Sequence, residues 1–121
     1  MIVHVALYAF RPETTDNQIE ASIRKLQEAS HKTGLVRWFL SGQHMPIAAD
    51  AAIPDQVYDF ALLWGFANRQ DLEEFSSHPV LTRCITETLQ PVLEKLAVVT
   101  LCDVNEVCWQ DAETEEQVYV S

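Results

Sequence analysis

Three short segments of this chain are apolar on both faces of a predicted strand. Residues 2–10, 57–66 and 97–104 are too short to cross a membrane and are rich in branched and aromatic side chains. A strand in an antiparallel sheet with one wet face alternates apolar and polar residues, and these three segments do not. Both faces of the sheet that they build must therefore be covered, and few small folds meet that requirement.

The segment between the first two predicted strands has the pattern of an amphipathic helix. Thr15 and Gln18 are spaced as in a capping box, in which a hydroxyl at the helix start is followed three residues later by Gln or Glu. Ile19 and Leu26 share one face of this helix, and charged residues occupy the other. Gly34 is placed to end it. We therefore expect a helix that packs one face on the sheet.

The remaining elements follow in the order strand, strand, helix pair, strand. Residues 35–44 alternate as a second strand, and residues 57–66 form the third. Residues 68–96 have a helical pattern, which Pro79 interrupts and in which Pro91 predicts a kink or a restart. The fourth strand is predicted at 97–104.

A loop at residues 45–56 joins the second and third strands. It contains two prolines and several alanines, and it has no pattern of a helix or a strand. Such a length is typical of a lid or of a dimer contact, although many loops of this kind are merely variable.

The order of elements predicts an α+β fold of the ferredoxin-like type. In this βαββαβ arrangement the four strands form an antiparallel sheet, and the helices cover one face of it. The apolar second face would then expose a larger patch than monomers tolerate. The simplest cover is a second copy, so we expect a homodimer whose sheet faces pack together into a dimeric α/β barrel.

Charge and composition exclude several classes of function. Of the 121 residues, 18 are acidic and 8 are basic, which gives a net charge of -10 and disfavours nucleic acid as a partner. The sequence has no basic amphipathic helix for a membrane surface and no apolar run of the length of a membrane span. Three cysteines without metal-type spacing suit reduced thiols and a cytoplasmic location.

No cofactor or metal ion is expected. The chain has only three glycines, set far apart, so it has no glycine-rich phosphate loop. The four histidines lack the spacing of metal ligands.

The composition divides the chain into two parts. Residues 1–104 form the predicted domain, and residues 105–121 form an acidic tail without Lys or Arg. The centre of the tail is expected to be solvated, and residues 118–120 are apolar enough to add a short strand to a sheet edge.

Three stretches carry a resemblance to a known family. They are Asp-Phe-Ala-Leu-Leu-Trp-Gly-Phe at 59–66, Asp-Leu-Glu-Glu-Phe-Ser-Ser-His-Pro at 71–79, and Leu-Glu-Lys-Leu-Ala-Val-Val-Thr-Leu-Cys-Asp at 93–103. Together with His4 and the apolar residues that follow it, they resemble the stress-responsive A/B barrel (Dabb) family. The resemblance covers residues 1–104, apart from the loop at 45–56.

The resemblance implies a dimeric α/β barrel with a cavity between the helices and the sheet of each protomer. A plant polyketide cyclase similar to this family uses a tyrosine and a histidine that flank the His-Pro pair. In this sequence the matching positions hold Phe75 and Leu81, and a further pocket histidine is replaced by Phe60. Phenylalanine and leucine transfer no proton, so the cyclase mechanism is not available in that form. Only His4 and His78 remain of the polar set.

The candidate catalytic residues are therefore His4 and His78. His4 shares a strand face with Tyr8, and its ordinary pKa suits a base or a polar anchor. The alternative for His4 is a histidine hydrogen-bonded inside the core. The alternative for His78 is a structural role at the chain break before Pro79. The candidate ligand-binding residues are Tyr8, Trp38, Phe60, Leu62, Trp64, Phe75 and Leu81, for which plain core packing is the alternative.

Three functions are compatible with these patterns. The first, which we favour, is a dimeric barrel that binds a small hydrophobic or aromatic molecule. The second is a cofactor-free enzyme of the same shape, a cyclase, lyase or monooxygenase, with His4 as its base. The third is an interaction module whose acidic tail recruits a basic partner.

Overall fold

The computed structural model describes residues 1–105 of the chain. The predicted acidic tail, with its short strand at 118–120, therefore lies outside the described residues except for Asn105. In chain order the elements are β1 (Ile2–Phe10), α1 (Asp16–Lys32), β2 (Trp38–Gln43), β3 (Phe60–Phe66), α2 (Arg69–Ser76), α3 (Pro79–Cys84), the π-helical turn η3 (Ile85–Leu89) and β4 (Leu93–Leu101). The loop between β2 and β3 contains two short 3₁₀ turns, η1 (Ala48–Ala52) and η2 (Pro54–Gln56).

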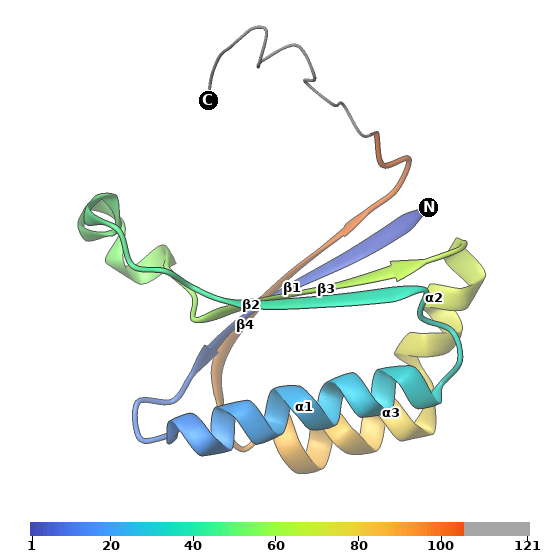
Figure 1. Cartoon of the computed structure of the whole chain (residues 1–121), viewed down its shortest axis with the longest axis horizontal. Helices are drawn as coiled ribbons and strands as arrows, with labels where there is room; N and C mark the ends of the chain where they lie inside the picture. Colours follow the sequence, from blue (N-terminus) through green and yellow to red (C-terminus); the bar gives the residue numbers. More distant parts are fainter. Residues whose placement is uncertain (106–121) are drawn as a thin grey trace, which may run out of the picture.

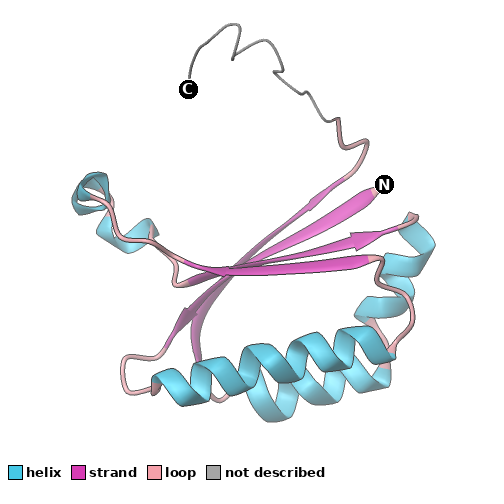
Figure 2. Cartoon of the chain, viewed as in Figure 1, coloured by secondary structure: helices cyan, strands magenta, loops and turns pink. Residues whose placement is uncertain are grey.

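The four strands form one antiparallel sheet in the order β2-β3-β1-β4. All the α-helices lie on one side of it, as Figure 1 and Figure 2 show. This is the predicted ferredoxin-like α+β fold. Two of the three segments that are apolar on both faces form its central strands, β1 and β3, and the third lies in the edge strand β4.

The face under the helices carries the hydrophobic core. Ala6 of β1 is paired with Leu62 of β3 and Val98 of β4, so the even-numbered residues of these strands share the helix side as far as the register shift between Ala9 and Phe10. Helix α1 begins with the predicted capping box, in which the Thr15 hydroxyl accepts a hydrogen bond from the Gln18 N–H at 3.2 Å. The Gln18 carboxamide in turn accepts one from the Thr15 N–H at 2.9 Å.

The opposite face, called the open face below, has no helix over it. Leu40 of β2 and Val99 of β4 lie on it, with 59% and 51% of their surface exposed. Trp38 also lies there and spreads its ring over Gly65, where a Cβ atom would come within 2.2 Å of the ring. The prediction that helices cover only one of two apolar faces is confirmed.

The predicted boundaries were wrong at the end of the second helical region. The helix does not continue through Leu96: it ends in the π-helical turn before Pro91, and β4 begins at Leu93 rather than at Ala97. Proline has no N–H to donate and clashes with the preceding turn, so Pro91 ends the helix instead of kinking it. Leu93 to Leu96 then pair with β1, and these long-range bonds override a helical spacing.

The second and third strands are also shorter than predicted. They begin at Trp38 and Phe60, whereas the sequence pattern placed their starts at residues 35 and 57. Within the described residues, no helix is long and apolar enough to cross a bilayer.

Candidate functional site

A cavity of about 230 Å³ lies between the sheet and the helices α2 and α3. Its lining is mostly apolar and comes from β1, β3 and β4 below, and from α1, α2, α3 and η3 above. The lining residues are His4, Ala6, Tyr8, Leu26, Trp64, Leu72, Phe75, Ser76, Leu81, Ile85, Leu96 and Val98. We refer to it as the His4 cavity.

The His4 cavity opens along the edge strand β4. Leu96 and Val98 belong to its lining, yet 53% and 60% of their surfaces are exposed. They lie on the helix side of the sheet, because Tyr8 and Ala6 are their partners in β1. The helices do not reach far enough over the sheet to cover them. A small molecule therefore has an apolar entrance to the cavity.

His4 of β1 lines the cavity and is paired with Thr100 of β4. Its Nδ1 lies 2.9 Å from the Thr100 hydroxyl, and its ring centroid lies 5.5 Å from that of Trp64. Burial lowers the pKa of His4 from its ordinary value of 6.5, so the ring is neutral at neutral pH. If Nδ1 carries the proton and donates it to Thr100, then Nε2 is left with a free lone pair. This tautomer makes His4 a hydrogen-bond acceptor or a base.

Tyr8 lies on the same face of β1, four residues further along. Only 5% of its surface is exposed, and its hydroxyl forms no hydrogen bond within the described part of the chain. Burial, and then the nearby Cys84, raise the pKa of Tyr8 to about 12, so the hydroxyl keeps its proton. Ala6 lies between His4 and Tyr8, and its small side chain leaves space between them. A buried hydroxyl without a partner is a donor available to a guest.

Aromatic and aliphatic side chains form the walls of the cavity. The rings of Trp64 and Phe75 lie 6.2 Å apart, and Leu81 of α3 lies on the same side. The Trp64 indole N–H does not point to a guest, because it donates to the Ser30 hydroxyl of α1 at 2.9 Å.

The structure brings together some of the predicted site residues and separates the others. His4, Tyr8, Trp64, Phe75 and Leu81 line one cavity. Leu62 is not part of the lining and is fully buried in the core. The Trp38 ring lies on the open face, so the sheet separates it from the cavity.

Phe60 and His78 also lie elsewhere. The Phe60 ring packs against Phe10 and lines a hollow under α1. His78 is the N-cap of α3, where its Nδ1 accepts a hydrogen bond from the Val80 N–H at 3.2 Å. This arrangement matches the structural alternative for His78.

Several cavity residues were not singled out from the sequence. Leu96 and Val98 line the cavity, and Thr100 lies beside His4, because of the register between β4 and β1. The sequence pattern placed Leu96 in a helix, so its position in β4 beside Tyr8 was not predicted. Once β4 starts at Leu93, simple alternation would have placed all three residues on the side of His4.

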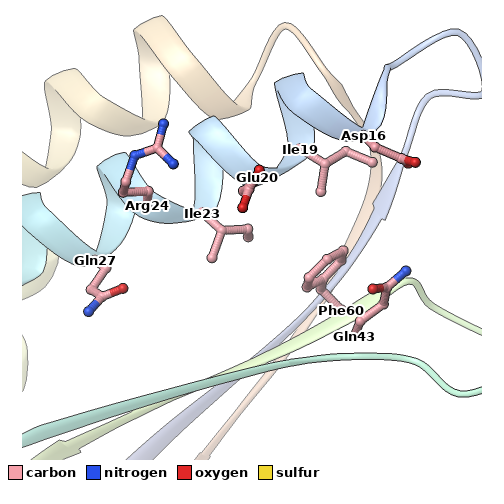
Figure 3. Close-up of a pocket in the computed structure, with 8 residues that line it drawn as sticks. All are labelled: Asp16, Ile19, Glu20, Ile23, Arg24, Gln27, Gln43 and Phe60. Carbon is pink, nitrogen blue, oxygen red and sulfur yellow. The ribbon is translucent and has the colours of Figure 1, made fainter.

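A second hollow of about 560 Å³ lies between α1 and the β2–β3 side of the sheet. Figure 3 shows Ile19 and Ile23 of α1 extending toward Phe60, with Gln43 beside it. Its remaining lining is charged or amide side chains that are exposed: Asp16, Glu20, Arg24 and Gln27. It contains no buried polar group aimed inward, so the His4 cavity is the better candidate site.

No metal site is present among residues 1–105, because no group of three His, Cys, Asp or Glu side chains converges there. Cys84 is half-buried, and burial raises the pKa of its thiol, which disfavours the reactive thiolate.

Comparison with known proteins finds a matching family model and solved structures that share the fold. The family model described as the stress responsive A/B barrel domain matches residues 2–102. No curated protein matches the sequence.

Several solved structures share the fold at low sequence identity. A dimeric ferredoxin-like protein of unknown function from Thermobifida fusca is 21% identical, with a TM-score of 0.68 over 83% of this chain and 88% of that one. A Dabb family protein with a ferredoxin-like fold from Mesorhizobium loti is 13% identical, with a TM-score of 0.71 over 86% and 97%. The hydroxynitrile lyase from Passiflora edulis is 17% identical, with a TM-score of 0.75 over 88% and 95%.

Proposed function

Because the chain belongs to the stress-responsive A/B barrel family, we propose that it forms a homodimer and binds a small, mostly apolar molecule in the His4 cavity. The observation that carries the binding proposal is the Tyr8 hydroxyl, buried and without a partner among the described residues. An apolar protein cavity of about 150 Å³ holds benzene, so the His4 cavity has room for a substituted ring.

The chemistry of the lining defines the class of guest. Apolar walls favour a hydrocarbon or aromatic body, and neither His4 nor Tyr8 carries a charge at neutral pH. A charged guest would lose its hydration without gaining an ion pair. The guest is therefore neutral and carries an oxygen that accepts a hydrogen bond from Tyr8.

The dimer follows from the open face of the sheet. Leu40, Val99 and Leu101 are exposed there, and such a patch on one protomer is covered by the same patch on another. The Thermobifida fusca protein, which shares this fold, is described as dimeric.

Ligand binding is tested with 4-propylphenol and propylbenzene as probes in calorimetric titrations. Val98→Trp fills the cavity entrance from an exposed position and should abolish binding of 4-propylphenol. Val80→Trp, on the solvent side of α3, is the matched control and should bind as the wild type does. Tyr8→Phe should remove the preference for the phenol over propylbenzene. No binding by the wild type up to millimolar probe, or equal binding by Val98→Trp, would contradict the proposal.

A second candidate is catalysis with His4 as the base. In the tautomer in which Nδ1 donates to Thr100, the neutral imidazole of His4 has a free Nε2 that accepts a proton. Tyr8 is a donor for an oxygen that gains negative charge. The Passiflora edulis neighbour is a hydroxynitrile lyase, so cyanide release from mandelonitrile is the first assay. His4→Ala should abolish turnover and leave binding of 4-propylphenol intact. If the wild type shows no turnover of mandelonitrile, the catalytic candidate fails this assay and ligand binding remains as the proposed function.

A further inference from the structure

Three large apolar side chains of the loop between β2 and β3 are exposed to solvent. Among the described residues, apart from Met1 and the strands, no other large apolar side chains are more exposed. Met45, Ile47 and Ile53 are 75%, 54% and 48% exposed. The loop has no Lys or Arg, and its acidic residues are Asp50 and Asp55. Exposing three large apolar side chains on one short segment is unfavourable in water, and such a group marks a contact surface.

Polar contacts hold this loop in a defined shape. The Asp50 carboxylate accepts hydrogen bonds from the Ile47 N–H at 2.9 Å and lies 2.8 Å from the His44 Nε2. These two contacts lower the pKa of Asp50. The apolar tip is therefore presented on an ordered scaffold.

A second set of contacts ties the loop to the sheet. Lys95 of β4 donates to the Asp55 carbonyl at 2.5 Å, and its Nζ lies 4.8 Å from the centroid of the Tyr58 ring. Lys95 pairs with Ala9 and so belongs to the open face, not to the helix side. This anchor places the loop at the margin of the open face.

The loop and the open face form one continuous surface. A hollow of about 450 Å³ lies at their junction, lined by Leu7, Gly42 and Ala61 of the sheet and by His44, Asp50 and Ile53 of the loop, among others. Leu7 and Ala61 are paired with each other and lie on the open face, as does Gly42. Figure 1 shows the loop extending past the end of the sheet on the side away from the helices.

The sheet face is small for a stable dimer interface, so a contact that extends beyond the sheet is favoured. Strands about 4.8 Å apart and about seven residues long give a four-stranded face a plan of roughly 19 by 23 Å. Stable dimers bury about 800 Å² of accessible surface per partner. An apolar segment that adjoins the face and extends beyond it adds to this area.

We propose that residues 45–56 form an arm that packs its apolar tip on a second copy of this chain, beside the sheet-to-sheet contact. This inference rests on the dimer of the proposed function and adds a specific element to it. The partner's surface would cover Met45, Ile47 and Ile53. The hollow beneath the loop would then receive side chains of the partner.

The test is the dimer dissociation constant, Kd, measured by sedimentation of the full-length chain. Met45→Ser, Ile47→Ser and Ile53→Ser combined should raise Kd by about a hundredfold, because three apolar side chains lose their buried contacts. Val80→Ser, exposed on α3 away from the arm, is the control and should leave Kd unchanged.

A second pair of variants keeps every apolar side chain and changes only the scaffold of the arm. Asp50→Ala removes the acceptor for the Ile47 N–H and should raise Kd by about tenfold. Asp50→Asn keeps an acceptor oxygen and should restore tight association. Circular dichroism confirms that each variant is folded.

The outcomes separate the arm from the dimer itself. A dimeric wild type whose Kd is unchanged by the triple variant and by Asp50→Ala would overturn the arm and leave the sheet-to-sheet dimer standing. A wild type that is monomeric at all concentrations would overturn both. The probe titrations of the His4 cavity report on ligand binding independently of either result.

Discussion

Ser30 is a polar residue that is only 1% exposed on the inner face of α1. Its hydroxyl donates to the Leu26 carbonyl at 2.7 Å and accepts from the Trp64 indole at 2.9 Å. Ser30→Ala would leave the buried indole N–H without a partner, so we expect a loss of about 1–3 kcal/mol in the free energy of unfolding. Guanidinium denaturation measures the difference.

The control for this prediction is the same change in a Trp64→Phe background. Phenylalanine has no N–H to satisfy, so Ser30→Ala should then cost well under about 1 kcal/mol. Equal losses in the two backgrounds would mean that the hydrogen bond contributes nothing.

The stability of the folded chain should depend on pH through the protonation of His4. Because burial lowers its pKa below 6.5, the unfolded chain takes up a proton at His4 before the folded chain does. Stability from this residue is therefore complete above pH 6.5 and decreases as the pH falls toward the lower pKa of the folded state. We expect the wild type to lose more stability than His4→Gln between about pH 7.5 and 5.5.

The measurement is the free energy of unfolding across that pH range for both proteins. His31→Gln, which makes the same change at an exposed histidine of α1, is the matched control. Parallel curves for the wild type and His4→Gln would show that His4 titrates alike in the folded and unfolded chains.

Among the elements, α3 depends on its cap. The helix is only six residues long, and its N-cap His78 precedes Pro79 at the first helical position. His78→Ala removes the acceptor for the Val80 N–H and should lower stability by about 0.5–2 kcal/mol, whereas His78→Asn should restore it. Thermal denaturation of the three proteins checks this order.

The same variants test whether His78 has a functional role. His78 is not part of the cavity lining, so binding of 4-propylphenol should be equal in all three folded proteins. If His78→Ala loses binding of 4-propylphenol without losing stability, His78 contributes to the binding site.

At the scale of the whole molecule, the open face predicts a concentration-dependent stability. Leu40 is 59% exposed in the protomer, so Leu40→Glu should leave the fold intact while placing two like charges in a sheet-to-sheet contact. We expect this variant to be monomeric under conditions in which Val80→Glu is dimeric.

Light scattering distinguishes the two variants, and the melting temperature supports the result. The wild-type melting temperature should rise with protein concentration, whereas that of Leu40→Glu should not. A dimeric Leu40→Glu with wild-type affinity would exclude the open face as the interface.

Local patterns were enough to predict most of the elements. The bounds of β1 and the start of α1 at its capping box were correct, and Gly34 takes the positive φ of 73° expected after a helix. These features depend on interactions between residues a few positions apart, so they can be predicted from the local sequence. The two-sided apolar strands likewise predicted a sheet with one apolar face that the helices leave uncovered.

The sequence by itself therefore determined the βαββαβ order, the first helix and the need to cover both sheet faces. The tertiary structure decided which side chains meet in the cavity, because strand register joins residues almost a hundred positions apart, as in His4 and Thr100. It placed Trp38 on the open face, and it assigned Leu93 to Leu96 to β4. These outcomes rest on pairing and packing between distant segments, which local propensity does not encode.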